Sequence, residues 1–216
     1  MTPGPKPRFA VPILFAVVFI DLVGFGILAL HALRAVADEC GGFVEERLGA
    51  RPELITLIIA AHPLAQSLAM PLWGTLSDRR GRRPVLLASM FGHGAAYLLL
   101  GFADSLWLLL LARILSGATS ANLSTAYAYI ADVTTPEERA GAMGRVSSAF
   151  GLGFAIGPAL GGLLAGGTTM DDANLLRPAI AAALFSFSAF LAIFAFLPET
   201  RQLSPASTPR AAGITL

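Results

Sequence analysis

The sequence is poor in cysteine and in charge, and both shortages limit what the protein can be. Cys40 is the only cysteine in 216 residues, which excludes an internal disulfide framework and a multi-cysteine metal site. Charged residues make up 13% of the chain, against about 25% in soluble proteins. The formal net charge is only +1, so the basic footprint of a nucleic-acid-binding protein is missing as well. These shortages argue against an ordinary soluble domain and against a nucleic-acid partner.

The motifs of common enzyme classes are also missing from the sequence. It has no glycine-rich phosphate-binding loop, no zinc-binding histidine pair and no nucleophile elbow. We therefore expect a protein that is not an enzyme and that uses no cofactor or metal.

Hydrophobic residues are abundant instead, at 55% of the chain. A helix needs roughly 20 predominantly apolar residues to cross a bilayer. Six segments meet that requirement, about Arg8–Val36, Leu54–Leu76, Pro84–Ala103, Leu106–Ala131, Ala140–Gly166 and Leu176–Leu197. The sequence thus predicts an all-α membrane protein with six transmembrane helices in residues 1–200. Residues 201–216, rich in Ser, Pro, Ala and Thr, are expected to form a disordered cytoplasmic tail.

Lysine and arginine are unevenly divided between the two sides of this predicted bundle. Ten fall on one side and four on the other, while Arg113 lies inside a span. Because Lys and Arg in short loops stay in the cytoplasm, both termini are expected there. The predicted location is the cell (inner) membrane.

The turn between the second and third spans, G-T-L-S-D-R-R-G-R-R-P, holds the densest charge. Gly74 would permit close helix approach, and Gly81 a turn with positive φ. Asp78 near a helix C-terminus, and Arg82 and Arg83 near a helix N-terminus, have the wrong sign for the helix dipole. We expect these residues to find partners across the turn or on a neighbouring helix; the alternative for the arginines is a purely topological role. The candidate residues of this turn are Gly74, Asp78, Arg79, Gly81, Arg82 and Arg83.

Two charged residues lie well inside predicted spans. Asp21 is about 13 residues into the first span, where an unpaired carboxylate is costly, so it should face the bundle interior and be protonated or paired. Arg113 is about seven residues below the outer end of the fourth span, and its guanidinium must find a carboxylate, carbonyl groups or water. A direct contact between Asp21 and Arg113 is one hypothesis. A helix-contact role for Asp21 and snorkelling of Arg113 to the interface are the alternatives.

The second span contributes a further candidate pair, His62 and Gln66. They lie one helical turn apart, so both side chains could hydrogen-bond a ligand from one face. His31 and His93 also lie within spans. For each of these histidines the alternative is a polar side chain satisfied by a neighbouring helix.

The fifth span contains the segment G-F-A-I-G-P-A-L-G-G. Gly153, Gly157 and Gly161 recur every four residues and form a smooth stripe for close packing of backbones. Pro158 frees a carbonyl group and predicts a bend. Together with Gly162, these residues are the candidates for close helix packing.

These motifs resemble the major facilitator superfamily. The charged turn is similar to the loop between the second and third helices of that family, and R-I-L-S-G from Arg113 is similar to its fourth-helix signature. The glycine–proline segment of the fifth span is similar to the signature of the antiporter branch, and the wider match resembles the tetracycline-efflux drug/proton antiporters. The resemblance covers about residues 9–200, which corresponds to one half of a twelve-helix transporter. It implies two inverted three-helix repeats.

The resemblance also implies roles for particular residues. Asp21 opens an Asp-x-x-Gly-x-Gly pattern similar to that of the family's first helix, and with Arg113 it is expected to serve proton coupling. Asp78 is expected to belong to a cytoplasmic gate that latches against the partner half. Asp132, with Arg82 or Arg83, is expected to join the same charge network, and Glu199 is a further candidate.

The implied function is proton-coupled efflux of a drug-like, tetracycline-type compound across a lipid bilayer, which would confer antibiotic resistance. Ala96 precedes Tyr97 where tetracycline antiporters have an acid, so export of some drug-like compound is better supported than tetracycline itself. Two alternatives stay open: a truncated remnant that does not transport, or a half-transporter that needs a partner. That partner would be a second six-helix half or, in a homodimer, a second copy of the chain.

Overall fold

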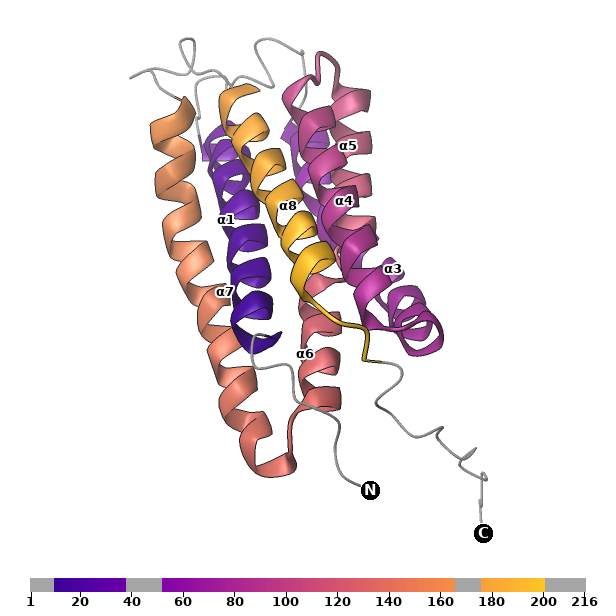
Figure 1. Cartoon of the computed structure of the whole chain (residues 1–216). Coiled ribbons are helices and arrows are strands. Elements are labelled where there is room, and N and C mark those ends of the chain that lie inside the picture. The colour runs from indigo at the N-terminus through magenta and orange to yellow at the C-terminus, as the bar shows by residue number, and fades with distance from the viewer. Residues whose placement is uncertain (1–9, 38–51, 166–175, 201–216) are drawn as a thin grey trace, which may run out of the picture.

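The chain is built from α-helices. The computed structural model describes residues 10–37, 52–165 and 176–200 (Figure 1). Its helices are α1 (Ala10–Ala37), α3 (Pro52–Arg80), α4 (Arg82–Gly101), α5 (Leu106–Ala118), α6 (Asn122–Val133), α7 (Pro136–Ala165) and α8 (Leu176–Phe196). These bounds lie close to the predicted spans, except that the fourth span is divided between α5 and α6. The predicted tail over 201–216 lies outside the described residues.

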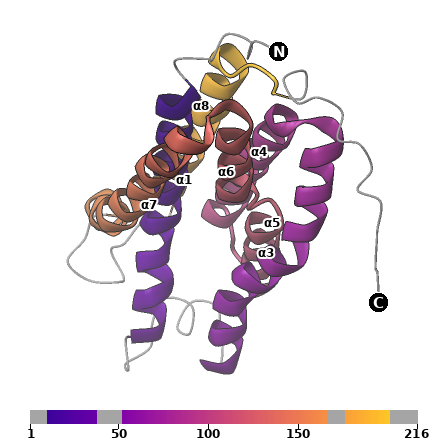
Figure 2. The same cartoon turned by 90° about the horizontal axis from the view of Figure 1, so that it is seen from below.

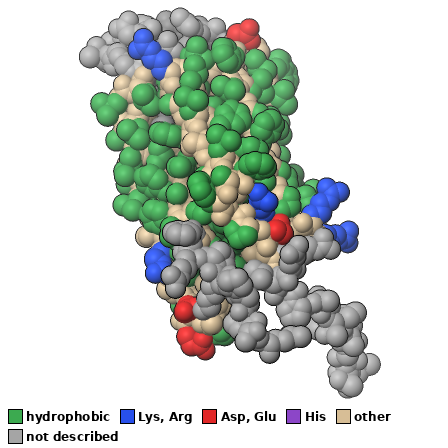
Figure 3. Space-filling model, viewed as in Figure 1, with side chains coloured by type: hydrophobic (Ala, Val, Ile, Leu, Met, Phe, Trp, Pro, Cys, Tyr) green, Lys and Arg blue, Asp and Glu red, His purple; other side chains and the backbone are tan. Residues whose placement is uncertain are grey.

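Part of the described bundle has the length and composition of membrane spans, while the full set of six predicted spans stays a prediction. Four described segments are long and apolar enough to cross a bilayer: Arg82–Gly101, Leu106–Val133, Pro136–Leu164 and Leu176–Phe196. Apolar side chains cover the sides of the bundle, and the charged side chains visible on this face lie towards its ends (Figure 3). A bundle of this kind matches the apolar interior and polar surfaces of a lipid bilayer.

Helices that are distant in sequence pack side by side. α1 packs on α7 and α8, α4 packs on α8, and α3 packs on α5. Seen along the bundle, α3 and α7 lie on opposite sides, with α1 and α6 between them (Figure 2). The start of α1 and the end of α8 lie at the same end of the bundle (Figure 1), as an even number of spans predicts. Which end faces the cytoplasm, and whether the helices form two inverted repeats, stay predictions.

Two clusters of buried apolar side chains hold the helices together. The larger one joins α1, α4, α6, α7 and α8 around residues such as Leu14, Leu86 and Tyr129, each 0% exposed. The smaller one joins α1, α4, α5 and α8 around Val23 and Tyr97. The polar residues discussed below lie between and beside these clusters, so their positions are fixed by packing on several helices.

The glycine stripe of α7 packs against α1. A Cβ atom on Gly157 would lie 2.8 Å from the Cα atom of Gly26, and one on Gly153 would lie 2.7 Å from Cβ of Leu22. Neither space admits a side chain without a shift of the α1 backbone or of a buried residue. Pro158 lies inside α7, where its ring approaches Gly26. The sequence therefore located the close-packed face, and the bend at Pro158 stays a prediction.

The other two glycines predicted for close helix packing, Gly161 of the stripe and its neighbour Gly162, lie further along the same helix. Gly161 is buried and Gly162 is half-buried, both in the last turns of α7.

The fourth predicted span is interrupted, which corrects the expectation of one continuous helix. α5 ends at Ala118 and α6 begins at Asn122, and the intervening backbone makes short-range turn bonds, including Ser120 N–H to Gly117 O at 3.0 Å. Non-helical backbone inside a bilayer is tolerated only where protein or a cavity surrounds it. The interruption therefore marks a position in the bundle where other side chains must complete the backbone hydrogen bonds.

Candidate functional site

Side chains of α3 and α4 satisfy the backbone at this interruption. Ser89 Oγ on α4 donates to Thr119 O at 2.6 Å and accepts from Ala121 N–H at 3.3 Å. Trp73 Nε1 on α3 donates to Ala118 O at 2.5 Å. These bonds replace those that a continuous helix would supply, so α3 and α4 hold the interruption in one conformation.

A cavity of about 690 Å³ lies beside the interruption, with walls from α1, α3, α4, α5, α6 and α7. All four residues predicted for the substrate and proton pathway line it: Asp21, His62, Gln66 and Arg113. The structure adds polar residues that the sequence did not single out as one site, His93, Tyr97, Ser120 and Asn122. Aromatic side chains of α1 and α7, Phe25, Phe150 and Phe154, form apolar wall. Its size and its mixture of apolar wall and few polar groups are typical of a small-molecule site.

Asp21 near the middle of α1 is 6% exposed and is held by two partners. Its Oδ1 atom lies 2.6 Å from Nδ1 of His93, and its Oδ2 atom accepts a hydrogen bond from Nδ2 of Asn122. The expectation of a buried and paired carboxylate is thus correct. The hypothesis of a direct contact with Arg113 is wrong for the described residues, because the ion pair of Asp21 is with His93 on α4.

His93 is 2% exposed and connects Asp21 to the α5–α6 interruption. Its Nε2 atom lies 3.0 Å from the carbonyl oxygen of Ser116 and 3.0 Å from the hydroxyl of Ser120. The ring of Tyr97, one helical turn further along α4, stacks on the imidazole at 5.7 Å between centroids. The imidazole of His93 is therefore held by hydrogen-bonding distances at Nε2, by the ion pair at Nδ1 and by the ring of Tyr97.

His62 and Gln66 both line the cavity from α3, as predicted, but His62 has a structural partner as well. Its Nδ1 atom lies 3.0 Å from Ser116 Oγ, and its ring packs on Phe25 with centroids 5.4 Å apart. The alternative of a polar side chain satisfied by a neighbouring helix therefore holds for His62, and a ligand contact stays a prediction. Its partner is on α5, where Gly117 lets the backbones approach closely, since a Cβ there would clash with the carbonyl oxygen of His62.

Arg113 on α5 contrasts with Asp21. Its Nε atom is buried without a hydrogen-bond partner, and the ion pairs of the described residues leave its guanidinium without a carboxylate. The side chain nevertheless lines the cavity. A guanidinium does not lose its charge, so the cavity carries a positive group whose countercharge the described part of the chain does not supply.

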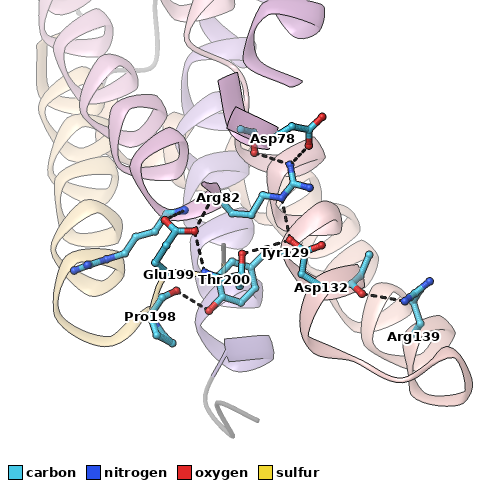
Figure 4. Close-up of polar contacts among 11 residues, drawn as sticks. Asp78, Arg82, Tyr129, Asp132, Arg139, Pro198, Glu199 and Thr200 are labelled. Atoms are coloured by element: carbon cyan, nitrogen blue, oxygen red, sulfur yellow. Dashed lines mark hydrogen bonds and ion pairs between the residues drawn. The ribbon is translucent and has the colours of Figure 1, made fainter. Parts of the chain in front are cut away.

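The charged turn between α3 and α4 forms a second cluster, at the end of the bundle where α8 also ends (Figure 4). Arg82 bridges two carboxylates: Nη1 lies 2.5 Å from Asp78 Oδ1, and Nε lies 3.0 Å from Asp132 Oδ2 on α6. This confirms the expectation of partners both across the turn and on a neighbouring helix. Of the two arginines proposed for Asp132, Arg82 is the one that contacts it.

Glu199, just beyond α8, completes this cluster. Its carboxylate accepts hydrogen bonds from Arg82 N–H at 3.0 Å and Arg83 N–H at 3.3 Å, the first backbone groups of α4. Gly81 has φ of 102°, and a Cβ there would clash with the Glu199 carboxyl group. The positive φ expected at Gly81 is thus present, and the negative charge that the N-terminus of α4 favours comes from Glu199.

Three further candidates of the turn take separate positions. Arg83 donates from Nη2 to Phe194 O at 2.6 Å, which ties α4 to α8. Arg79 is exposed in the last turn of α3. Gly74 is exposed, with no described atom within 4 Å of a Cβ placed there, so its expected close approach to another helix does not occur within the described chain.

The fold and the cavity define the class of protein. Apolar spanning helices surround a cavity that contains few charged groups, and one spanning helix is interrupted beside it; both features are characteristic of membrane transporters. The family model described as Major Facilitator Superfamily matches residues 12–215. The chain belongs to the Major Facilitator Superfamily.

Known relatives support that assignment. The chain is 39% identical over 146 residues to the class B tetracycline resistance protein of Escherichia coli, covering 68% of this chain and 35% of that protein. It is 34% identical over 193 residues to the class E protein of Escherichia coli, covering 88% of this chain and 44% of the relative. The solved structure of the human organic anion transporter MFSD10 aligns with a TM-score of 0.70 and 28% identity, covering 93% of this chain and 50% of that one. The chain thus spans half or less of the length of these relatives.

Proposed function

We propose that the chain is one half of a proton-coupled exporter of a drug-like compound in the cell (inner) membrane, with both termini in the cytoplasm. The observation that carries the proposal is the cavity in which Asp21, His62, Gln66 and Arg113 meet beside an interrupted helix. Ionisable groups inside a membrane bundle are costly, and their usual role is to bind ions or substrate. The names of the tetracycline resistance relatives support a drug-like, tetracycline-type substrate.

A second half is part of this proposal. Leu64, Leu68 and Leu72 are 58%, 78% and 71% exposed and repeat every four residues along α3, so one face of this helix is open to lipid or to another helix. The open space beside Gly74 on the same helix suits the close approach of a partner helix. The side chain of Asp78 is 68% exposed despite its contact with Arg82, which leaves it accessible for the gate contact with the partner half. That partner is a second six-helix half or a second copy of this chain.

Transport in everted membrane vesicles tests the proposal, with tetracycline as the probe. We expect uptake of tetracycline driven by an acidic interior, and proton release when the probe is added. Asp21→Asn and Arg113→Ala should each abolish both signals. Asp104→Asn and Arg177→Ala are the matched controls, because Asp104 is exposed in the turn between α4 and α5 and Arg177 is exposed in the first turn of α8.

The same vesicles separate the alternatives. If the chain alone gives neither signal and crosslinks only as a monomer, it is a remnant that does not transport. If the signals appear only when a second six-helix half is co-expressed, the chain is a half-transporter. Proton-dependent uptake that survives Asp21→Asn would contradict the proposed coupling.

A second candidate substrate class is the organic anion. Arg113 favours it, because this buried cation has no carboxylate partner among the described residues while Asp21 is already paired. The solved relative MFSD10, a human organic anion transporter, is in keeping with this. A fluorescent organic anion in place of tetracycline tests it: uptake that Arg113→Ala abolishes and Arg177→Ala retains would favour the anion, and no uptake would eliminate it.

A further inference from the structure

The environment of His93 constrains where its protons lie. The carbonyl oxygen of Ser116, 3.0 Å from Nε2, only accepts hydrogen bonds, so Nε2 carries a proton at that contact. On the other side of the ring, Nδ1 lies 2.6 Å from a carboxyl oxygen of Asp21. This is an ion-pair distance without the alignment of a hydrogen bond, and the negative carboxylate favours an imidazole with protons on both ring nitrogens. With the carboxylate ionised and the imidazole protonated, the two side chains together have no net charge.

We propose that Asp21 and His93 hold one exchangeable proton as a pair, and that Ser120 takes over the hydrogen bond of His93 Nε2 when this proton leaves. This rests on the proposed proton-coupled function and names the group that binds the proton. It replaces the hypothesis that Arg113 is the partner of Asp21.

Loss of the proton must leave a stable arrangement, and Ser120 provides one. The remaining imidazole proton belongs on Nδ1, because this nitrogen lies 2.6 Å from the ionised carboxylate of Asp21. Nε2 then presents a lone pair, which the carbonyl oxygen of Ser116 repels. The hydroxyl of Ser120, 3.0 Å from Nε2, both donates and accepts, so it rotates to donate to the bare nitrogen.

The path of the proton follows from these contacts. The Nε2–H bond breaks as its proton passes to Ser120 Oγ, and the original hydroxyl proton of Ser120 passes to water in the cavity that Ser120 lines. The pair changes from neutral to a charge of −1, and no other bond is made or broken. The protonated imidazole thus becomes a neutral imidazole whose one proton is on Nδ1.

Other ionisable groups face the pair from the surrounding helices. His62 on α3, Tyr97 on α4 and Arg113 on α5 line the same cavity, while α6 contributes the amide of Asn122. α7 contributes aromatic side chains to this wall. Loss of the proton stabilises the charged side chain of Arg113, because it leaves a negative charge in the same cavity. The charge state of the pair therefore sets the net charge that a bound molecule meets.

Nitrogen NMR of the histidine rings tests the loss of the Nε2 proton directly. The full chain, labelled with ¹⁵N-histidine, is reconstituted in lipid nanodiscs without any transported compound and titrated with base. The sequence has three histidines, and His93→Gln assigns the signal of interest by its loss. We expect Nε2 of His93 to change from a protonated to an unprotonated nitrogen as the pH rises, while Nδ1 stays protonated. If Nε2 keeps its proton throughout the titration, the proposal is wrong.

Two variants show whether the named partners are responsible. Ser120→Ala removes the donor for bare Nε2, so Nε2 should stay protonated at a pH where the native chain has lost this proton. Ser188→Ala is the matched control, because this exposed hydroxyl bonds only within α8 and should leave the titration unchanged. Asp21→Asn should abolish the step, with circular dichroism as the check on folding. An unaltered step in both Ser120→Ala and Asp21→Asn would overturn the pair.

The outcome is distinguishable from that of the transport assay. Loss of the Nε2 proton in a chain that moves no tetracycline would support the proton-binding pair and contradict the exporter. Proton-dependent uptake without this loss would retain the exporter and eliminate the pair as its proton site.

Discussion

Ser89 provides the sharpest test of how the interrupted helix is stabilised. This side chain is 0% exposed, and its hydroxyl satisfies both the carbonyl of Thr119 and the N–H of Ala121. Ser89→Ala would remove the side-chain partner of both groups and leave only the bond between them, from Ala121 N–H to Thr119 O at 2.8 Å. A buried group that loses its partner altogether costs about 1–3 kcal/mol, whereas interhelical hydrogen bonds measured in a membrane bundle average about 0.6 kcal/mol. Because the two groups keep their mutual bond, we expect a loss of about 1 kcal/mol, or roughly fivefold in the unfolding equilibrium.

Ser186 on α8 is a matched control within the same bundle. It too is 0% exposed, but its hydroxyl has no hydrogen-bond partner among the described residues. Ser186→Ala removes the same atom from an equally buried site without orphaning another group. We expect it to be neutral or slightly stabilising, because the unpaired hydroxyl is itself a burial cost.

Equilibrium unfolding of the purified chain in mixed micelles, followed by circular dichroism, measures both variants. Ser89→Ala should lower the free energy of unfolding clearly more than Ser186→Ala. Equal losses would mean that the packing of the serine side chain matters and its hydrogen bonds do not. A neutral Ser89→Ala would mean that the freed backbone groups find water or other partners, so the interruption would not depend on α4.

The same unfolding assay checks three further predictions. Gly157→Ala should lower the free energy of unfolding by about 1–3 kcal/mol, since its new methyl group meets the α1 backbone. Gly151→Ala, with nothing within 4 Å of the new methyl group, should be neutral or stabilising. Equal effects of the two changes would contradict the close contact. Glu199→Gln should cost about 0.5–1 kcal/mol by removing the negative charge at the start of α4, an effect that high salt should reduce. Arg82→Lys should cost under about 1 kcal/mol, because an ammonium cannot bridge two carboxylates as the guanidinium does but the cluster is partly exposed. A double variant with Asp132→Asn should then lose little more than either change alone.

Apolar runs were sufficient to predict most of the helices, because a spanning helix needs a long stretch with little charge. The interruption of the fourth span escaped this reasoning. Thr119, Ser120 and Ala121 are small and do not lower the average hydropathy enough to end a run. The available signal was chemical: Ser, Thr and Asn hydrogen-bond to nearby backbone groups and so compete with the helix. Gly117 followed by this polar segment and Asn122 has that composition.

The partner of Asp21 could not be predicted for a different reason. Its depth in the span implied a buried partner, but several polar side chains lie at similar depths on other helices. Which one it contacts depends on how α1, α4 and α6 cross, and that is set by the two apolar clusters. By contrast, the contacts of Arg82 were predictable in kind, because a short turn confines its possible partners to a few residues.

The two buried charged residues, Asp21 and Arg113, differ in whether the described chain supplies them with a partner. Asp21 is completed within the described chain by His93 and Asn122, on α4 and α6, so it is held whether or not a ligand is bound. Arg113 lines the same cavity without a carboxylate partner among the described residues. A buried cation without such a partner is stable only if water solvates it or if a bound molecule or another chain supplies a countercharge. The partners of Asp21 are therefore set by the fold, whereas Arg113 is available to pair with a molecule that enters the cavity. This asymmetry is what a binding site needs if proton and substrate are to affect each other through charge.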